Sequence, residues 1–167
     1  QEVRNLIKGS ENEITFINFD VGGHVGNPSK EQYIDWMKFG SFTPIMRPHA
    51  TKVLERYREP WVYDKETLDI CREYINMRYR LLGYLYSLAF ENYINGEPMF
   101  KSLGYEYPNN KKLKNVYDSY IMGHNIMISP FGCVINKPVS KKYFINGVYA
   151  TYYSGRELKG KALKKVK

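Results

Sequence analysis

The sequence predicts an α/β fold followed by an antiparallel β module, and three observations carry this prediction. Two apolar runs, residues 14–19 and 42–46, each lead into polar residues. A capped helical pattern separates the two runs, and a much longer helical pattern follows the second. Consecutive βα units of this kind lie side by side in a parallel sheet. After Glu97 the helical period gives way to short strand-like segments broken by turns, which favours antiparallel structure.

The first part of the chain opens with apolar residues at helical spacing over residues 2–8. Residues 14–19 are rich in β-formers and almost continuously apolar, as buried parallel strands are. The next helix has clear start and stop signals. Ser29 is a good N-cap, Gln32 completes a capping box three residues later, and Gly40 ends the pattern.

The second predicted strand covers residues 42–46, although Pro44 lacks a ladder donor. Asp64 then caps the longest helix, residues 65–95, and Gly96 lies beyond its end. Arg78 interrupts the apolar stripe of this helix, so we expect its guanidinium to find a buried acceptor. The residues predicted to form the stripe are Leu68, Cys71, Ile75, Leu82, Leu85 and Ala89.

The predicted β module contains four strand-like segments: residues 99–100, 104–107, 121–131 and 143–153. The last of these contains Asn146-Gly147, a pair that accepts the positive φ values of a tight turn and therefore predicts a hairpin.

Composition narrows the function classes. Hydrophobic residues make up 43% of the 167 residues, which is enough for a packed core. The net charge is +8, and nine of the 25 lysines and arginines follow residue 136. No alternation of aromatic and arginine residues accompanies them, so we expect a solvated basic end rather than a nucleic-acid partner. No apolar run reaches the length of a membrane span, and we expect no membrane partner. The two cysteines, Cys71 and Cys133, are expected to pack as small apolar groups.

Chemically capable residues gather where the two predicted strands end. Asp20 closes the first run, and Arg47 and His49 close the second. His24 follows in a glycine-rich loop. Because the ends of neighbouring parallel strands share one edge of a sheet, we expect Asp20, Arg47 and His49 to face a common site.

Six segments, in this order and spacing, form a recognisable set: Asp20-Val21-Gly22-Gly23, residues 31–44, Arg47-Pro48-His49, Arg58-Glu59-Pro60-Trp61, residues 77–87 and Gly96-Glu97-Pro98-Met99. Together they resemble glycoside hydrolase family 31, and the resemblance runs from about Ile14 to Gly160. Members of that family are mostly retaining α-glucosidases and α-xylosidases, with some lyases and transglycosylases.

The resemblance implies the last two βα units of an eight-stranded (β/α)8 TIM-type barrel over residues 1–96, and part of the proximal C-terminal β-sandwich domain over residues 97–167. Retention needs two carboxyl groups about 5 Å apart. In the family both are aspartates on earlier barrel strands, so this chain is expected to carry no catalytic residue and to be inactive alone. The start at Gln1 fits a piece of a longer polypeptide. No cofactor and no metal ligand are implied.

The resemblance assigns substrate-binding roles to a few positions. Asp20 and His49 match residues that line the −1 subsite, and Arg47 matches an arginine expected to brace carboxylates. His24 stands where the family usually has an aromatic residue, which leaves the sugar specificity open. The implied partners are an α-linked oligosaccharide or glycoside and the remainder of the barrel.

Two other functions compete with this interpretation. The tyrosine-rich C-terminal half would suit a noncatalytic module that binds glycans or a partner protein. The basic charge would suit a nucleic-acid binder, whose affinity would fall steeply with salt.

Overall fold

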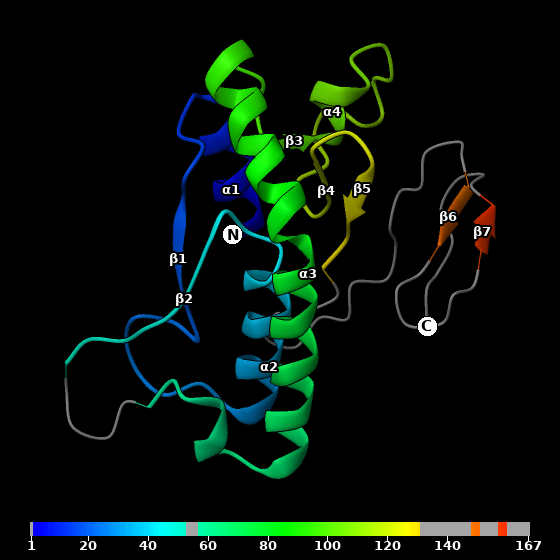
Figure 1. The fold of residues 1–167 in the computed structure, drawn as a ribbon. Helices are drawn as coiled ribbons and strands as arrows, with labels where there is room; N and C mark the ends of the chain where they lie inside the picture. The colour runs from blue at the N-terminus through cyan, green and yellow to red at the C-terminus, as the bar shows by residue number, and fades with distance from the viewer. Residues whose placement is uncertain (1, 53–56, 131–147, 151–156, 160–167) are drawn as a thin grey trace. The chain divides into compact units, whose positions relative to one another are not determined.

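The computed structural model describes residues 2–52, 57–130, 148–150 and 157–159. The chain divides into two compact units, residues 1–133 and 134–167, each described by itself. In chain order the first unit contains α1 (Glu2–Glu11), β1 (Asn18–Val21), α2 (Lys30–Gly40), β2 (Ile45–Pro48), the 3-10 helix η1 (Pro60–Val62), α3 (Lys65–Asn95), β3 (Phe100–Ser102), α4 (Leu103–Glu106), β4 (Tyr120–Met122) and β5 (Ile126–Ile128) (Figure 1).

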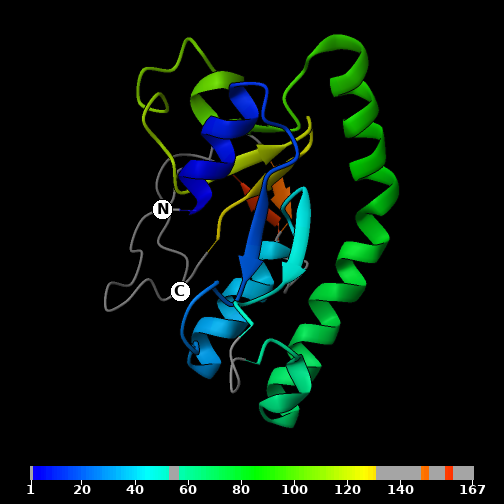
Figure 2. The same ribbon diagram turned by 90° about the vertical axis from the view of Figure 1, so that its left-hand side faces the viewer.

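Strands β1 and β2 form a parallel pair, with α2 between them in sequence and α3 following β2 (Figure 2). Phe19 and Val21 of β1 are buried, whereas Asn18 is exposed and Asp20 is partly exposed. Since successive side chains of a strand point to opposite faces, Asp20 lies on the face away from the core.

Both strands begin later than predicted. The apolar residues Ile14 and Phe16 are 63% and 59% exposed and precede the strand, which starts at Asn18. In the second case the amides of Phe42 and Thr43 turn back to the carbonyls of Phe39 and Gly40 and extend the end of α2. These bonds keep residues 42–44 out of the ladder, and β2 starts after Pro44.

The predicted caps of both helices are confirmed. The amide of Gln32 donates to Ser29 Oγ, and the amide of Ser29 donates to Gln32 Oε1, which completes the capping box of α2. Asp64 Oδ1 accepts the amide of Thr67 at 2.8 Å at the start of α3. Gly96 ends α3 in the left-handed conformation, with φ 69°.

The predicted apolar stripe of α3 is partly wrong. Leu82 is 45% exposed, and the buried face instead contains Tyr74, Met77 and Leu88 beside Cys71 and Leu85. Burial raises the pKa of the Cys71 thiol to about 11, in keeping with the packing role predicted for it. Cys133 lies outside the described residues.

The acceptors predicted for Arg78 are three backbone carbonyls. Its guanidinium donates to Ser41 O at 3.2 Å, Thr43 O at 2.7 Å and Pro44 O at 2.8 Å. These carbonyls belong to the link between α2 and β2. The side chain therefore fastens the middle of α3 to the segment that leads into β2.

Strands β3, β4 and β5 form an antiparallel sheet in that order. Two strand predictions here are wrong. Residues 103–106 form helix α4, because Ser102 caps it by accepting the amide of Tyr105 at 2.9 Å. Residues 121–131 are not one strand, because a turn with Gly123 at φ 63° separates β4 from β5. In the second unit β6 (Val148–Ala150) pairs antiparallel with β7 (Glu157–Lys159), and the predicted Asn146-Gly147 turn lies outside the described residues.

One hydrophobic core joins the three-stranded sheet to the helices and to β1. Its buried members are Leu6, Ile7, Phe19, Phe39, Leu85, Leu88, Met99, Phe100, Tyr120 and Met122. Burial of these side chains from α1, β1, the end of α2, α3, β3 and β4 in one cluster means that the elements before and after Glu97 stabilise one another.

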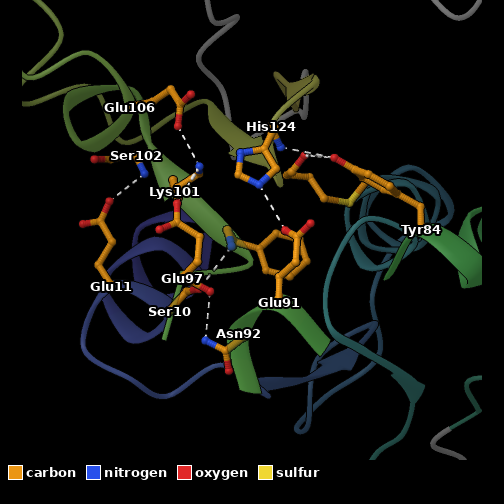
Figure 3. Close-up of polar contacts among 12 residues, drawn as sticks. Ser10, Glu11, Tyr84, Glu91, Asn92, Glu97, Lys101, Ser102, Glu106 and His124 are labelled. Atoms are coloured by element: carbon orange, nitrogen blue, oxygen red, sulfur yellow. Dashed lines mark hydrogen bonds and ion pairs between the residues drawn. The ribbon is translucent and has the colours of Figure 1, made fainter. Parts of the chain in front are cut away.

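Polar contacts also fasten the free edge of this sheet (Figure 3). Ser10 Oγ and Glu11 Oε1 of α1 accept the amides of Phe100 and Ser102 at 3.1 Å and 2.7 Å. An edge strand otherwise presents unpaired amides that invite another chain, so α1 protects β3 in place of a fourth strand.

Lys101 is a buried cation in the same sheet, with its side chain 2% exposed. Its ammonium pairs with Glu106 at 2.7 Å and Glu97 at 3.0 Å (Figure 3). Burial alone would lower the pKa of Lys101, but the two carboxylates outweigh burial and raise it. Across the sheet, Tyr84 of α3 donates to Met122 O at 3.0 Å and thereby ties α3 to β4.

Among the helices that the structure describes, none combines the length and the apolar character needed to cross a membrane.

Replacing Arg78 with lysine should destabilise the protein by about 2 kcal/mol, because one ammonium cannot reach three carbonyls arranged for a guanidinium fork. Urea unfolding of the protein measures this loss. Arg72→Lys on the same helix is the matched control, since Arg72 is 57% exposed and pairs with Asp69 at the surface. Equal stabilities of the two variants would contradict the anchoring role of Arg78.

Candidate functional site

The register of the parallel pair places the predicted site residues. Asp20 of β1 is the register partner of Arg47 of β2. Both residues lie near the carboxyl ends of their strands, and His24 and His49 follow within a few residues. The two strand ends therefore deliver all four predicted side chains to one edge of the pair.

Asp20 is the centre of the resulting contacts. Arg47 Nη2 donates to Asp20 Oδ1 at 2.7 Å, and His24 Nδ1 lies 2.7 Å from Asp20 Oδ2. An ionised carboxylate only accepts hydrogen bonds, so His24 Nδ1 carries the shared proton. The Asp20 side chain is 16% exposed, whereas those of Arg47 and His24 are each 52% exposed.

The carboxyl group of Asp20 is held in its ionised form. Partial burial acts to raise its pKa, but the hydrogen bonds from Arg47 and His24 outweigh burial, and the positive charge of Arg47 adds to them. The pKa of Asp20 consequently lies below its ordinary value. A full negative charge at this position suits the binding of hydroxyl donors or of a cation.

His49 completes the cluster. The ring centroids of His24 and His49 are 5.7 Å apart, with the planes tilted by 36°. One potential ligand atom from each of Asp20, His24 and His49 lies within 4.8 Å of the other two. Sequence reasoning named all three residues, but only as sugar contacts, and the structure adds that they could hold one metal ion. An open depression lined by residues 106–112 includes none of them.

The loop that carries His24 depends on glycine. Gly22, Gly23 and Gly26 all have positive φ, at 92°, 83° and 73°. A Cβ at Gly22 would lie 2.6 Å from Arg58 Cδ and 3.2 Å from Tyr33 Cδ2, so even a methyl group has no room there. The loop is thereby fixed by both backbone conformation and close packing.

Arg58 fixes this loop through hydrogen bonds to its backbone carbonyls. It is 5% exposed, and its Nη2 donates to Gly23 O at 2.7 Å and Gly26 O at 2.6 Å, while Nε donates to Gly23 O at 3.1 Å. The amide of Thr51 donates to His24 O at 3.0 Å on the other side. Sequence reasoning gave Arg58 no role, because nothing in its local pattern indicates carbonyl partners more than 30 positions away.

The comparison with known families decides the classification. The family model described as "Glycosyl hydrolases family 31 TIM-barrel domain" matches residues 1–88. The one described as "Glycosyl hydrolase family 31 C-terminal domain" matches residues 96–167. The chain belongs to glycoside hydrolase family 31. The family indicated by the sequence motifs is thus confirmed.

The similar curated proteins include two alpha-glucosidases. Neutral alpha-glucosidase C of Mus musculus is 38% identical over 125 residues, which are 75% of this chain and 14% of that protein. Alpha-glucosidase 2 of Bacillus thermoamyloliquefaciens is 33% identical over 149 residues, 88% of this chain and 18% of that protein. The chain therefore spans less than one fifth of these relatives.

Two solved structures share the fold of this chain. The Flavobacterium johnsoniae GH31 dextranase complexed with glucose has a TM-score of 0.85 at 27% identity, over 98% of this chain and 21% of that chain. The cycloalternan-forming enzyme from Listeria monocytogenes has a TM-score of 0.89 at 22% identity, over 98% of this chain and 16% of that chain. At the lower identity the likeness concerns the fold alone.

Replacing Arg58 with lysine should loosen the loop of His24. Loss of charge-assisted bonds of about 1.5 kcal/mol should speed local opening by about tenfold. Amide hydrogen exchange of Gly23 and Thr51, which donate to Asp20 O and His24 O, measures this opening. Arg72→Lys again serves as the control, and unchanged exchange in Arg58→Lys would exclude a positioning role.

Proposed function

We propose that this chain supplies part of the sugar-binding site of a retaining α-glycosidase, similar to an α-glucosidase, that hydrolyses terminal α-linked sugars. The observation that carries the proposal is the convergence of Asp20, His24 and His49 at the end of a parallel strand pair, with Asp20 ionised. The names of the relatives support the substrate class, because two are alpha-glucosidases and one is a dextranase complexed with glucose.

In this proposal residues 1–96 form the last two βα units of the eight-stranded barrel, and residues 97–167 form part of the proximal C-terminal β-sandwich domain. The nucleophile and the acid/base are aspartates on barrel strands upstream of this chain. Its own residues therefore bind and orient the sugar, and take no part in bond cleavage. The carboxyl ends of barrel strands are where such residues lie in TIM-barrel enzymes.

Each side chain has a distinct task. Asp20 accepts hydrogen bonds from sugar hydroxyls with the lone pairs that Arg47 and His24 leave open, since a carboxylate offers about four acceptor positions. Arg47 keeps that carboxylate ionised and oriented. His49 contributes an imidazole that can donate to or accept from a neighbouring hydroxyl. Hydrogen bonds that tighten as the sugar approaches its oxocarbenium-like transition state lower the barrier.

His24 sets this site apart from the usual family pattern. An aromatic ring at this position would offer an apolar face for sugar stacking, whereas His24 uses one ring nitrogen on Asp20. The ring still lies half exposed beside His49. Sugar recognition at this edge consequently relies on polar contacts more than on stacking.

Replacing Asp20 or His49 with alanine in the enzyme that contains this chain should lower kcat/KM on an aryl α-glucoside by about 100-fold, equivalent to roughly 3 kcal/mol of transition-state stabilisation. Steady-state kinetics measures the effect. Asp69→Ala and His124→Ala are matched controls, because both residues form surface ion pairs elsewhere, with Lys65 or Arg72 and with Glu91. Activity within a factor of two of the parent in both site variants would refute the assignment.

A further inference from the structure

We infer that Asp20, His24 and His49 form a binding site for a divalent transition-metal ion such as Zn²⁺. Each of the three offers a ligand atom within 4.8 Å of the others. The ion would occupy the position proposed for the sugar, so that its binding excludes the sugar. This consequence rests on the proposed function, but the metal site itself does not.

The ligand set selects the class of ion. Two imidazoles and one carboxylate match the nitrogen and oxygen donors that Zn²⁺ and similar ions take. Mg²⁺ and Ca²⁺ prefer all-oxygen surroundings and are poorly served by two histidines. Three protein ligands also leave a fourth position open for water.

The geometry needs small movements. Zn–ligand bonds of about 2.0–2.1 Å in a tetrahedral site place neighbouring ligand atoms about 3.3 Å apart. The 2.7 Å contact between His24 Nδ1 and Asp20 Oδ2 must therefore lengthen. The ligand atoms now lie within 4.8 Å of one another, so any pair farther apart than about 3.3 Å must come closer. The side chain of His24 is 52% exposed and His49 is also exposed, so rotation of the two rings can supply both changes in distance. The proton on His24 Nδ1 must move to Nε2 when Nδ1 binds the ion, because a ligating nitrogen needs its lone pair.

Arg47 limits the affinity without closing the site. Its guanidinium contacts Asp20 Oδ1, whereas His24 Nδ1 contacts Oδ2, so a metal bound through Oδ2 and the arginine would use different carboxylate oxygens. A nearby positive charge still repels the ion. The site should accordingly bind more weakly than a structural zinc centre. His24 and His49 lie in separate loops, after β1 and after β2. Arg58 supports the site because it fixes the loop of His24.

Isothermal titration calorimetry with ZnCl₂ on the chelator-treated protein tests the inference. We expect saturable binding of one Zn²⁺, and no binding of Mg²⁺ at the same concentrations. His24→Phe and His49→Gln should each weaken Zn²⁺ binding by about tenfold or more, since even an outer-shell partner of a metal typically contributes that much. His24→Phe changes a half-exposed loop residue, and His49→Gln provides a second variant with a smaller change of volume.

The third histidine of the chain provides the matched control. His124 is 50% exposed and pairs with Glu91 at 3.0 Å, so His124→Phe removes a comparable surface imidazole outside the cluster. Zn²⁺ affinity should be unchanged in this variant. The inference is overturned if the protein binds no Zn²⁺ at millimolar concentration. Equal affinities of the parent, His24→Phe and His49→Gln would overturn it as well.

Titration of Zn²⁺ into the enzyme that contains this chain, in the presence of glucose, separates this inference from the proposed function. Weaker apparent Zn²⁺ binding with glucose supports both. A Zn²⁺ affinity that depends on His24 and His49 but is the same with and without glucose supports the metal site and contradicts the sugar site. Glucose binding without Zn²⁺ binding, measured by the same calorimetry, leaves the sugar site in place and overturns the metal site.

Discussion

The site depends on one constraint, the register of the parallel pair β1 and β2. Asp20 faces Arg47 only because Asn18 pairs with Ile45 and the two strands run in the same direction. A shift by one residue would turn Asp20 toward the core and expose Phe19 or Val21, because side chains alternate along a strand. Burial of these apolar residues and the ion pair on the opposite face therefore favour the same register. The functional face and the hydrophobic core cannot be changed independently.

Two arginines hold the segments around this pair, and both do so through backbone carbonyls. Arg78 fixes the link between α2 and β2, while Arg58 fixes the loop after β1. A backbone carbonyl is present whatever side chain its residue carries. These arginines therefore constrain the path of the backbone and do not depend on the identity of the residues that they contact. A guanidinium suits this task because its donors point in several fixed directions within one plane. The exposed site residues thus rest on buried, charge-assisted contacts, which limits how far the strand ends can drift.

Local signals in the sequence are sufficient for α2 and α3 but insufficient for the strands and for the short helix α4. The caps at Ser29 and Asp64 are read from a few adjacent residues, and the structure places both helices accordingly. Residues 14–19 have no alternation that could locate a strand boundary, and tertiary packing buries only part of the run. Ser102, which caps α4, is also the last residue of β3, whereas the sequence pattern predicts a strand over residues 104–107. The convergence of Asp20, Arg47 and His49 follows from the strand-end rule, and His24 is assigned to the site only through the family resemblance. The support from Arg58 depends on contacts between distant positions.

The position of His24 determines which kind of ligand this edge favours. An apolar ring there would leave Asp20 Oδ2 to sugar hydroxyls and would shield the carboxylate from water. The imidazole instead occupies Oδ2 and exposes a polar ring, so the edge is better hydrated and presents more donors and acceptors. A sugar must then displace water or rearrange the His24–Asp20 contact to gain the full carboxylate. The proposed metal ion would gain from the same arrangement, because His24, which competes with a sugar for Asp20, would become one of its ligands. In the proposed site, an imidazole in place of an aromatic ring would therefore weaken selection by stacking and add selection by coordination at a single position.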